Sequence, residues 1–206
     1  MALTTKIKAG PESSQIDWKN TTGSSVSIGA IVKVGRRYGR LFSSANGNAS
    51  AAAVAANEYG VVDMAGIFKV PKVTATAYAV GDEVIWSATN SKVYAAGTRG
   101  KGWQVVEAAV NGDTTVLVRF NDNIHTWGTE YTTDATDNSN NYATIDTGLG
   151  ATPTGLVTAR ISTAAGVHRM PQGVVEWLLT SDLGKIKISD SGLAASEIVT
   201  VTAEVI

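Results

Sequence analysis

The sequence predicts a mainly β protein, with a small β-barrel or β-sandwich-like N-terminal domain and a second small β-rich C-terminal domain. Short runs rich in Val, Ile, Thr and aromatic residues recur along the chain, separated by Gly, Asn and Asp turn signals. The 206 residues, 44% of them hydrophobic, suffice for one or two cores. Residues 1–121 carry 13 Lys and Arg against 8 Asp and Glu, whereas residues 122–206 carry 4 against 10. This asymmetry indicates two modules with different surfaces.

The first segment, residues 1–16, holds few apolar side chains and includes Gly10-Pro11. Such a composition predicts a flexible N-terminal arm. An arm of this kind can order by adding a strand to an exposed sheet edge of a partner.

The N-terminal domain is predicted over residues 17–121. Its strands are expected in the runs 26–34, 60–70, 83–87, 102–109 and 114–120. The alanine-rich run 48–56 departs from this pattern and favours a short helix by propensity.

Residues 122–153 change to Asn, Asp, Thr and Gly with isolated apolar positions, which predicts a polar linker or long loop. The C-terminal domain is then expected over residues 154–206. Within it, Lys185-Ile186-Lys187-Ile188 alternates strictly, as a half-exposed strand should.

Several chemistries are excluded by composition and motif. The chain has no Cys, which removes disulfides, thiolate metal sites and cysteine nucleophiles. A phosphate-binding loop fails, because Gly102 follows Gly100-Lys101 and position 95 is Ala. We therefore expect no enzymatic activity and no cofactor.

Charge and hydropathy narrow the partners. A net charge of -1 gives no general basic field for nucleic acid. No stretch approaches the apolar length of a membrane helix, and no secretion signal opens the chain. We expect neither nucleic acid nor membrane as a partner, and synthesis in the cytoplasm of a host cell.

The histidines and the acidic loop offer weaker candidates. His125 and His168 lack metal-ligand spacing and are expected either on the surface or in a loop. The carboxylates Asp134, Asp137 and Asp146 lack the spacing of a calcium-binding loop, which favours a solvated loop. No metal ligand is assigned.

Basic and aromatic residues are the best candidates for binding. The densest basic cluster is Lys33, Arg36, Arg37 and Arg40. It fits either a docking patch for an acidic protein surface or a solvated hairpin. Trp86, Trp103 and Trp177 sit in apolar runs typical of a core. Trp18 and Trp127 lie in polar sequence and are candidate interface aromatics or, equally, packed anchors of a linker.

The order of motifs in residues 17–121 resembles that of a known family. The motifs are Trp18-Lys19-Asn20, Gly60-Val61-Val62, the run from Gly66 to Lys72, the run from Gly81 to Trp86, the run from Gly102 to Ala109 and the run from Gly112 to Phe120. In this order they resemble the small β-rich capsid cement, or decoration, proteins of tailed bacteriophages. Residues 122–206 extend beyond the short members of that family.

The resemblance implies a structural protein of the virion that binds the outside of the assembled capsid at local symmetry positions and stabilises the shell. It also implies the major capsid protein as partner and a homotrimer on the capsid. We expect Lys33, Arg36, Arg37 and Arg40, together with Lys6 and Lys8 of the arm, to face the capsid.

Two other classes of function remain open on the sequence. A carbohydrate-binding or adhesion module displayed on the virion would stack Trp127, Tyr131 and Tyr142 on sugar faces. A hydrolase would use His125 or His168 as its base.

Overall fold

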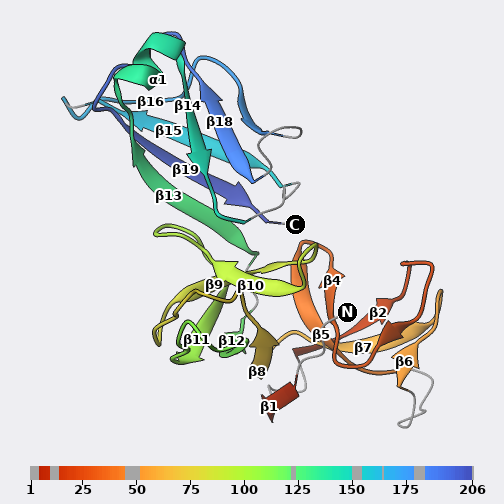
Figure 1. The fold of residues 1–206 in the computed structure, drawn as a ribbon. Helices are drawn as coiled ribbons and strands as arrows, with labels where there is room; N and C mark the ends of the chain where they lie inside the picture. The colour runs from red at the N-terminus through yellow and green to blue at the C-terminus, as the bar shows by residue number, and fades with distance from the viewer. Residues whose placement is uncertain are drawn as a thin grey trace. The chain divides into compact units, whose positions relative to one another are not determined.

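A computed structural model describes residues 5–9, 14–44, 52–121, 124–149, 155–163, 165–178 and 184–205, with side chains from residue 14 onward. Strands dominate these residues (Figure 1), and the prediction of a mainly β fold is confirmed. The chain divides into two compact units. The first comprises Met1–Tyr94 and Gly102–Ile124, and the second Ala95–Lys101 and His125–Ile206.

The larger sheet of the first unit has six strands in the order β1-β8-β12-β11-β9-β10. Their bounds are β1 Thr5–Ala9, β8 Gly66–Pro71, β9 Glu83–Ser87, β10 Lys92–Ala95, β11 Trp103–Glu107 and β12 Thr115–Phe120. β12 pairs antiparallel with β8 over its full length and with β11 on its other side. β12 therefore lies in the interior of the sheet.

Aromatic side chains form the centre of the core that this sheet covers. Trp103 stacks on Phe120 with ring centroids 3.7 Å apart, and Phe68 lies 4.4 Å from Phe120 on its neighbouring strand. Trp86 contacts Trp103 at 6.2 Å, and all four rings are at most 3% exposed. Each such contact adds about 0.5–1.5 kcal/mol to the stabilisation from burial. Trp86 and Trp103 are core residues, as predicted.

A second sheet of the first unit has the order β2-β7-β5-β4, and a two-stranded ribbon joins β3 to β6. Their bounds are β2 Gln15–Lys19, β3 Val26–Ser27, β4 Ile31–Val34, β5 Arg37–Ser44, β6 Ala53–Val54 and β7 Tyr59–Asp63. Val26, Val32, Leu41, Val54 and Val62 are buried together in its core. A short helix was expected over residues 48–56, but residues 53–54 form the strand β6. Residues 45–51 lie outside the described part of the chain.

Asn20, the last residue of the Trp18-Lys19-Asn20 motif, organises the loop after β2. Its side chain is fully buried and donates hydrogen bonds to the carbonyl oxygens of Ser24 (2.8 Å) and Val54 (2.9 Å). Its carbonyl oxygen accepts the backbone N–H of Thr22 at 3.1 Å. Because a buried amide must satisfy both its donors and its acceptor, this position requires Asn.

The predicted N-terminal arm contains β1. Thr5 pairs with Lys69 and Ala9 with Gly66, and the register shifts between Lys6 and Lys8. The structure therefore differs from a free arm here, because β1 adds to the β8 edge of its own chain. Residues 1–4 and 10–13 lie outside the described part.

The second unit contains two antiparallel sheets, ordered β13-β19-β15-β16 and β14-β18-β17. Their bounds are β13 Thr126–Thr132, β14 Tyr142–Asp146, β15 Val157–Ser162, β16 His168–Arg169, β17 Val175–Trp177, β18 Lys185–Ser189 and β19 Ile198–Glu204, and α1 spans Ala135–Asn140. Alternate residues of β14, β18 and β19 are buried, so each sheet hides one face, as in a sandwich. Trp177 is 8% exposed and belongs to the core, as predicted. Within the described residues, no helix has the length and hydrophobicity needed to cross a membrane.

The structure differs from the predicted linker over 122–153, because β13, α1 and β14 occupy residues 126–146. β13 pairs with β19 over seven residues, from Thr126 opposite Glu204 to Thr132 opposite Ile198. The second unit therefore begins near residue 125 rather than 154. The pairing partner is more than 60 residues away in sequence, which is why local composition did not reveal the strand.

The last residue of β10 and the segment that follows it, residues 95–101, belong to the second unit. Gly128 exchanges backbone hydrogen bonds with this segment, donating to Ala96 at 2.9 Å and accepting from Arg99 at 3.0 Å. A Cβ on Gly97 would lie 2.3 Å from the carbonyl oxygen of Gly128, and one on Gly100 would lie 1.9 Å from that of Ala96. Glycine is required here because the two backbones approach closely.

Candidate functional site

The basic cluster of the sequence lies on the β4–β5 hairpin. Val34 pairs with Arg37, which leaves Gly35 and Arg36 as a two-residue turn, and Gly35 has the positive φ of 62° that such turns favour. Lys33 and Arg36 are exposed and Arg37 is half-buried. Three of the four predicted basic residues therefore surround the hairpin tip.

Arg40, the fourth residue, is turned toward the interior. It is half-buried, and its guanidinium lies 5.7 Å from the centre of the Phe68 ring. Burial lowers the pKa of Arg40, and the negative charge of Asp63 acts in the opposite direction. Asp63 is also its register partner on β7. The structure thus gives Arg40 contacts within its own unit.

Two hollows flank the hairpin tip. The first, here called the Ile16 hollow, has a volume of about 300 Å³ and is lined by apolar side chains with Arg36 and Arg37 at its margin. Its apolar lining comprises Ile16, Val34, Met64 and Ile124. The second, the Trp18 hollow, has a volume of about 370 Å³ and contains Lys33 and Gly35. Its other lining residues are Trp18, Thr21, Thr22, Val26, Ile31 and Val32.

Trp18 takes part in this site as a half-buried residue. It packs against the core of the smaller sheet and presents the rest of its ring to the Trp18 hollow. A large aromatic surface beside a basic side chain is typical of interface anchors. Sequence reasoning singled out Trp18 but not the hollow, because β2, β3 and β4 assemble the hollow from three stretches of the chain.

Lys6 and Lys8 lie on β1, a strand of the larger sheet, whereas the hairpin belongs to the smaller one. Their backbones pair with Phe68 and Ile67. Their side chains lie outside the described part of the chain.

Of the two roles predicted for Trp127, interface aromatic or packed anchor, the structure supports the packed one. It is 5% exposed within β13, because pairing with β19 turns it into the second unit. Tyr131 donates its hydroxyl to Asp137 at 2.8 Å. Tyr142 is 36% exposed, with the ammonium of Lys187 4.5 Å from its ring centre. Trp127 is therefore not available to stack on a sugar, as the carbohydrate-binding alternative required.

His125 lies in the loop directly before β13, one of the two placements predicted for it, but it is fully buried rather than on the surface. Burial lowers its pKa to about 3, and a group of such low basicity is a poor general base at neutral pH. His168 is exposed on β16, with Nδ1 2.8 Å from the hydroxyl of Ser162.

Asp134 and Asp137 cap the start of α1, whereas Asp146 accepts the backbone N–H of Gly148 after β14. Asp134 accepts the backbone N–H groups of Thr136 and Asp137, and the Asp137 carboxylate accepts the backbone N–H of Asp134. This is a capping box. No group of three or more His, Asp or Glu able to hold a metal ion occurs among the described residues.

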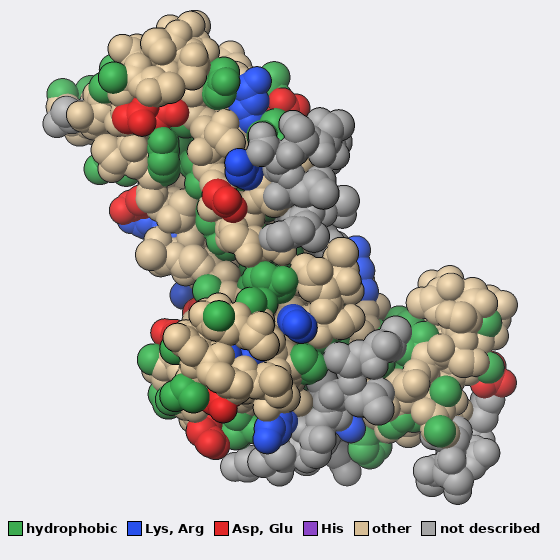
Figure 2. Space-filling model, in the orientation of Figure 1, with side chains coloured by type: hydrophobic (Ala, Val, Ile, Leu, Met, Phe, Trp, Pro, Cys, Tyr) green, Lys and Arg blue, Asp and Glu red, His purple; other side chains and the backbone are tan. Residues whose placement is uncertain are grey.

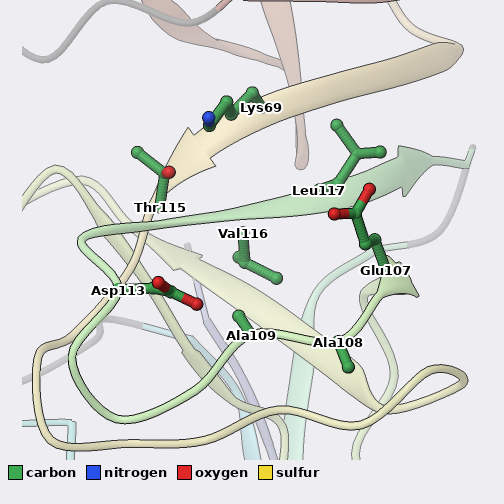
Figure 3. A pocket seen from close by; sticks show the side chains of 8 residues that line it. All are labelled: Lys69, Glu107, Ala108, Ala109, Asp113, Thr115, Val116 and Leu117. Atoms are coloured by element: carbon green, nitrogen blue, oxygen red, sulfur yellow. The ribbon is translucent and has the colours of Figure 1, made fainter.

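A third hollow, the Glu107 hollow, lies on the larger sheet (Figure 3) and has a volume of about 340 Å³. Lys69 of β8 and Leu117 of β12 line it together with Glu107 and Asp113. In Figure 3 the side chains of Glu107 and Asp113 lie on opposite sides of Val116. Figure 2 shows acidic and basic side chains interspersed over the face that it draws.

These features define a class: a β-rich protein whose first unit carries three hollows lined by apolar and charged side chains. The comparison with protein families identifies the family. The model of the phage cement protein family matches residues 11–120, more than half of the chain, and the chain belongs to this family. No curated protein and no solved structure matches the chain.

Proposed function

We propose that this chain is a decoration protein that binds the outer surface of an assembled phage capsid at local symmetry positions and stabilises the shell. Its membership of the phage cement protein family carries the proposal and supports a capsid-associated, structural role. The partner is the major capsid protein, and the protein assembles on the capsid as a homotrimer. It acts by binding and catalyses no reaction.

Stabilisation of this kind follows from mass action. A protein that binds the closed lattice but not its separated subunits shifts the equilibrium toward the lattice. Each bound copy contributes a small contact, and symmetry repeats the contact over the shell. A rigid β frame suits this role because little conformational entropy is lost on binding.

The Ile16 hollow is the surface that we assign to the capsid. It combines an apolar concavity with Arg36 and Arg37 at the hairpin tip, and Ile16 is 39% exposed. Apolar burial supplies affinity, and the guanidinium groups select an acidic rim and set the register. The expected counterpart on the capsid protein is a small apolar projection flanked by carboxylates.

The test is occupancy of purified capsids by the variant R36E/R37E. We expect its affinity for capsids to fall about tenfold or more, and the salt dependence of binding to weaken. The matched control is R119E, which reverses an exposed charge on β12 of the same unit and should bind normally.

Thermal unfolding of both variants establishes that they are folded. Unchanged occupancy and salt dependence of folded R36E/R37E would remove the Ile16 hollow from the capsid contact. Absence of the wild-type protein from capsids at saturating concentration would end the proposed function itself.

A further inference from the structure

Two tight turns of the first unit each expose a valine. Val80 is 65% exposed and Val110 is 66% exposed. An aspartate fastens each turn: Asp82 accepts the backbone N–H of Ala79 at 2.8 Å, and Asp113 accepts that of Val110 at 2.8 Å. Each valine is therefore presented to solvent on a turn that a hydrogen bond to its own aspartate holds in place.

The two turns form one rim. Tyr78 and Ala109, which precede the two valines by one or two residues, exchange backbone hydrogen bonds of 2.8 and 2.9 Å. Gly81 also donates to the carbonyl oxygen of Val105 at 2.9 Å. Residues 79–82 and 110–113 are therefore held together, and we call them the valine rim.

The Glu107 hollow adjoins the valine rim through Asp113, which belongs to both (Figure 3). Its charged lining comprises two carboxylates, Glu107 and Asp113, and one ammonium, Lys69. This balance favours a cationic group as occupant. The surface thus offers apolar projections beside an acidic recess.

The Trp18 hollow has the complementary pattern. It is an apolar recess of about 370 Å³ with an exposed cation, Lys33, in its lining. Valine side chains match its lining of Val26, Ile31 and Val32 in polarity. The first unit therefore carries two complementary surfaces. One is the valine rim beside the acidic Glu107 hollow, and the other is the apolar Trp18 hollow beside the basic side chain of Lys33.

We propose that the valine rim of one copy docks into the Trp18 hollow of a second copy, with Val110 entering the hollow and Lys33 reaching the Glu107 hollow. Because the two surfaces differ, this contact is head-to-tail, and repeating it either closes a ring or extends a chain. Closure into a ring of three rests on the trimer of the proposed function, whereas the contact itself does not.

A charge swap tests whether the two surfaces face each other. K33E and E107K each place like charges in the contact, and we expect each to weaken self-association at least about fivefold. The double variant K33E/E107K restores the pair in the opposite sense and should recover most of the lost association. Sedimentation of the full-length protein over a range of concentrations measures this effect, in solution and with empty capsids.

Cross-linking identifies the contact directly. The chain has no Cys, so introduced cysteines report only their own positions. We expect T21C and V110C copies, mixed and treated with a short bis-maleimide, to give a T21C–V110C product, and the double variant to give trimers. V174C in place of V110C is the control, because Val174 is 56% exposed but belongs to the second unit.

Three outcomes would overturn the inference: failure of the double charge swap to recover association, absence of the T21C–V110C product at high protein concentration, or loss of capsid occupancy by V110D without change in self-association. The last result would assign the valine rim to the capsid. Loss of all capsid binding with cross-linking intact would instead reject the proposed function and leave the contact standing.

Discussion

The buried histidine of the second unit makes stability depend on pH in a specific window. His125 has a pKa of about 3 in the folded protein because burial removes the water that would solvate its charge. In the unfolded chain a histidine has a pKa of about 6.5. Between these values the unfolded chain binds a proton that the folded protein does not, so stability falls as the pH falls. The contribution is fully present above pH 6.5 and declines toward pH 3.

The size of the effect follows from linkage. Each pH unit within the window costs about 1.4 kcal/mol, so lowering the pH from 7.5 to 5 should remove about 2 kcal/mol from the unfolding free energy. Urea unfolding at pH 7.5, 6.0 and 5.0 measures this change.

Two variants isolate the cause. H125Q removes the titrating group and should flatten the pH dependence between pH 7.5 and 5, whatever its effect on stability at pH 7.5. H168Q removes the exposed histidine on β16 and should keep the wild-type slope. An H125Q slope equal to that of the wild type would refute the assignment of the pH dependence to His125.

Three further predictions concern packing and buried polar contacts, each measured by urea unfolding at pH 7. N20A should destabilise the first unit by about 2–3 kcal/mol, because it leaves buried carbonyl groups unsatisfied. G39A places a Cβ 2.4 Å from a side chain of β7 and should cost about 1–3 kcal/mol, whereas G112A meets nothing within 4 Å and should change stability by less than about 0.5 kcal/mol. D190N removes the carboxylate that binds Arg169 and two backbone N–H groups, and should destabilise the second unit by about 3 kcal/mol.

The sequence predicted those parts of the fold in which local pattern and tertiary environment agree. Ile186 and Ile188 are fully buried while Lys185 and Lys187 are half-buried, as strict alternation requires. The pattern is visible because each apolar side chain is flanked by a charged one. The apolar run that contains Trp103 predicts a core position for a different reason, because several neighbouring residues are hydrophobic together.

The sequence misled where burial depends on a distant partner. Trp127 and His125 lie in polar sequence, yet both are buried. Trp127 is on β13, which pairs with β19, and the carbonyl oxygen of His125 accepts the backbone N–H of Val205, the residue after β19. The run from Thr126 to Thr132 does contain Thr, Trp and Tyr, residues that favour strands. That signal was outweighed by the Asn and Asp residues on both sides, which belong to turns and to the cap of α1.

The candidate surfaces were predictable only in part. Charge density alone located Lys33, Arg36 and Arg37, because consecutive basic residues are visible in one dimension. The Ile16 hollow combines Ile16 of β2, Val34 of β4, Met64 directly after β7, and Ile124, so no local sequence pattern could reveal it. The valine rim was not predictable either, because a single valine in a polar turn forms no sequence pattern.

The hairpin tip can serve two contacts because it borders two hollows. Lys33 lines the Trp18 hollow, and Val34, the next residue along the chain, lines the Ile16 hollow. Gly35, at the turn, borders both. We assign the two hollows to different partners, the Ile16 hollow to the capsid and the Trp18 hollow to a second copy. A copy seated on the shell would hold its hairpin in place for the next copy, so that two weak contacts reinforce each other without either needing high affinity alone.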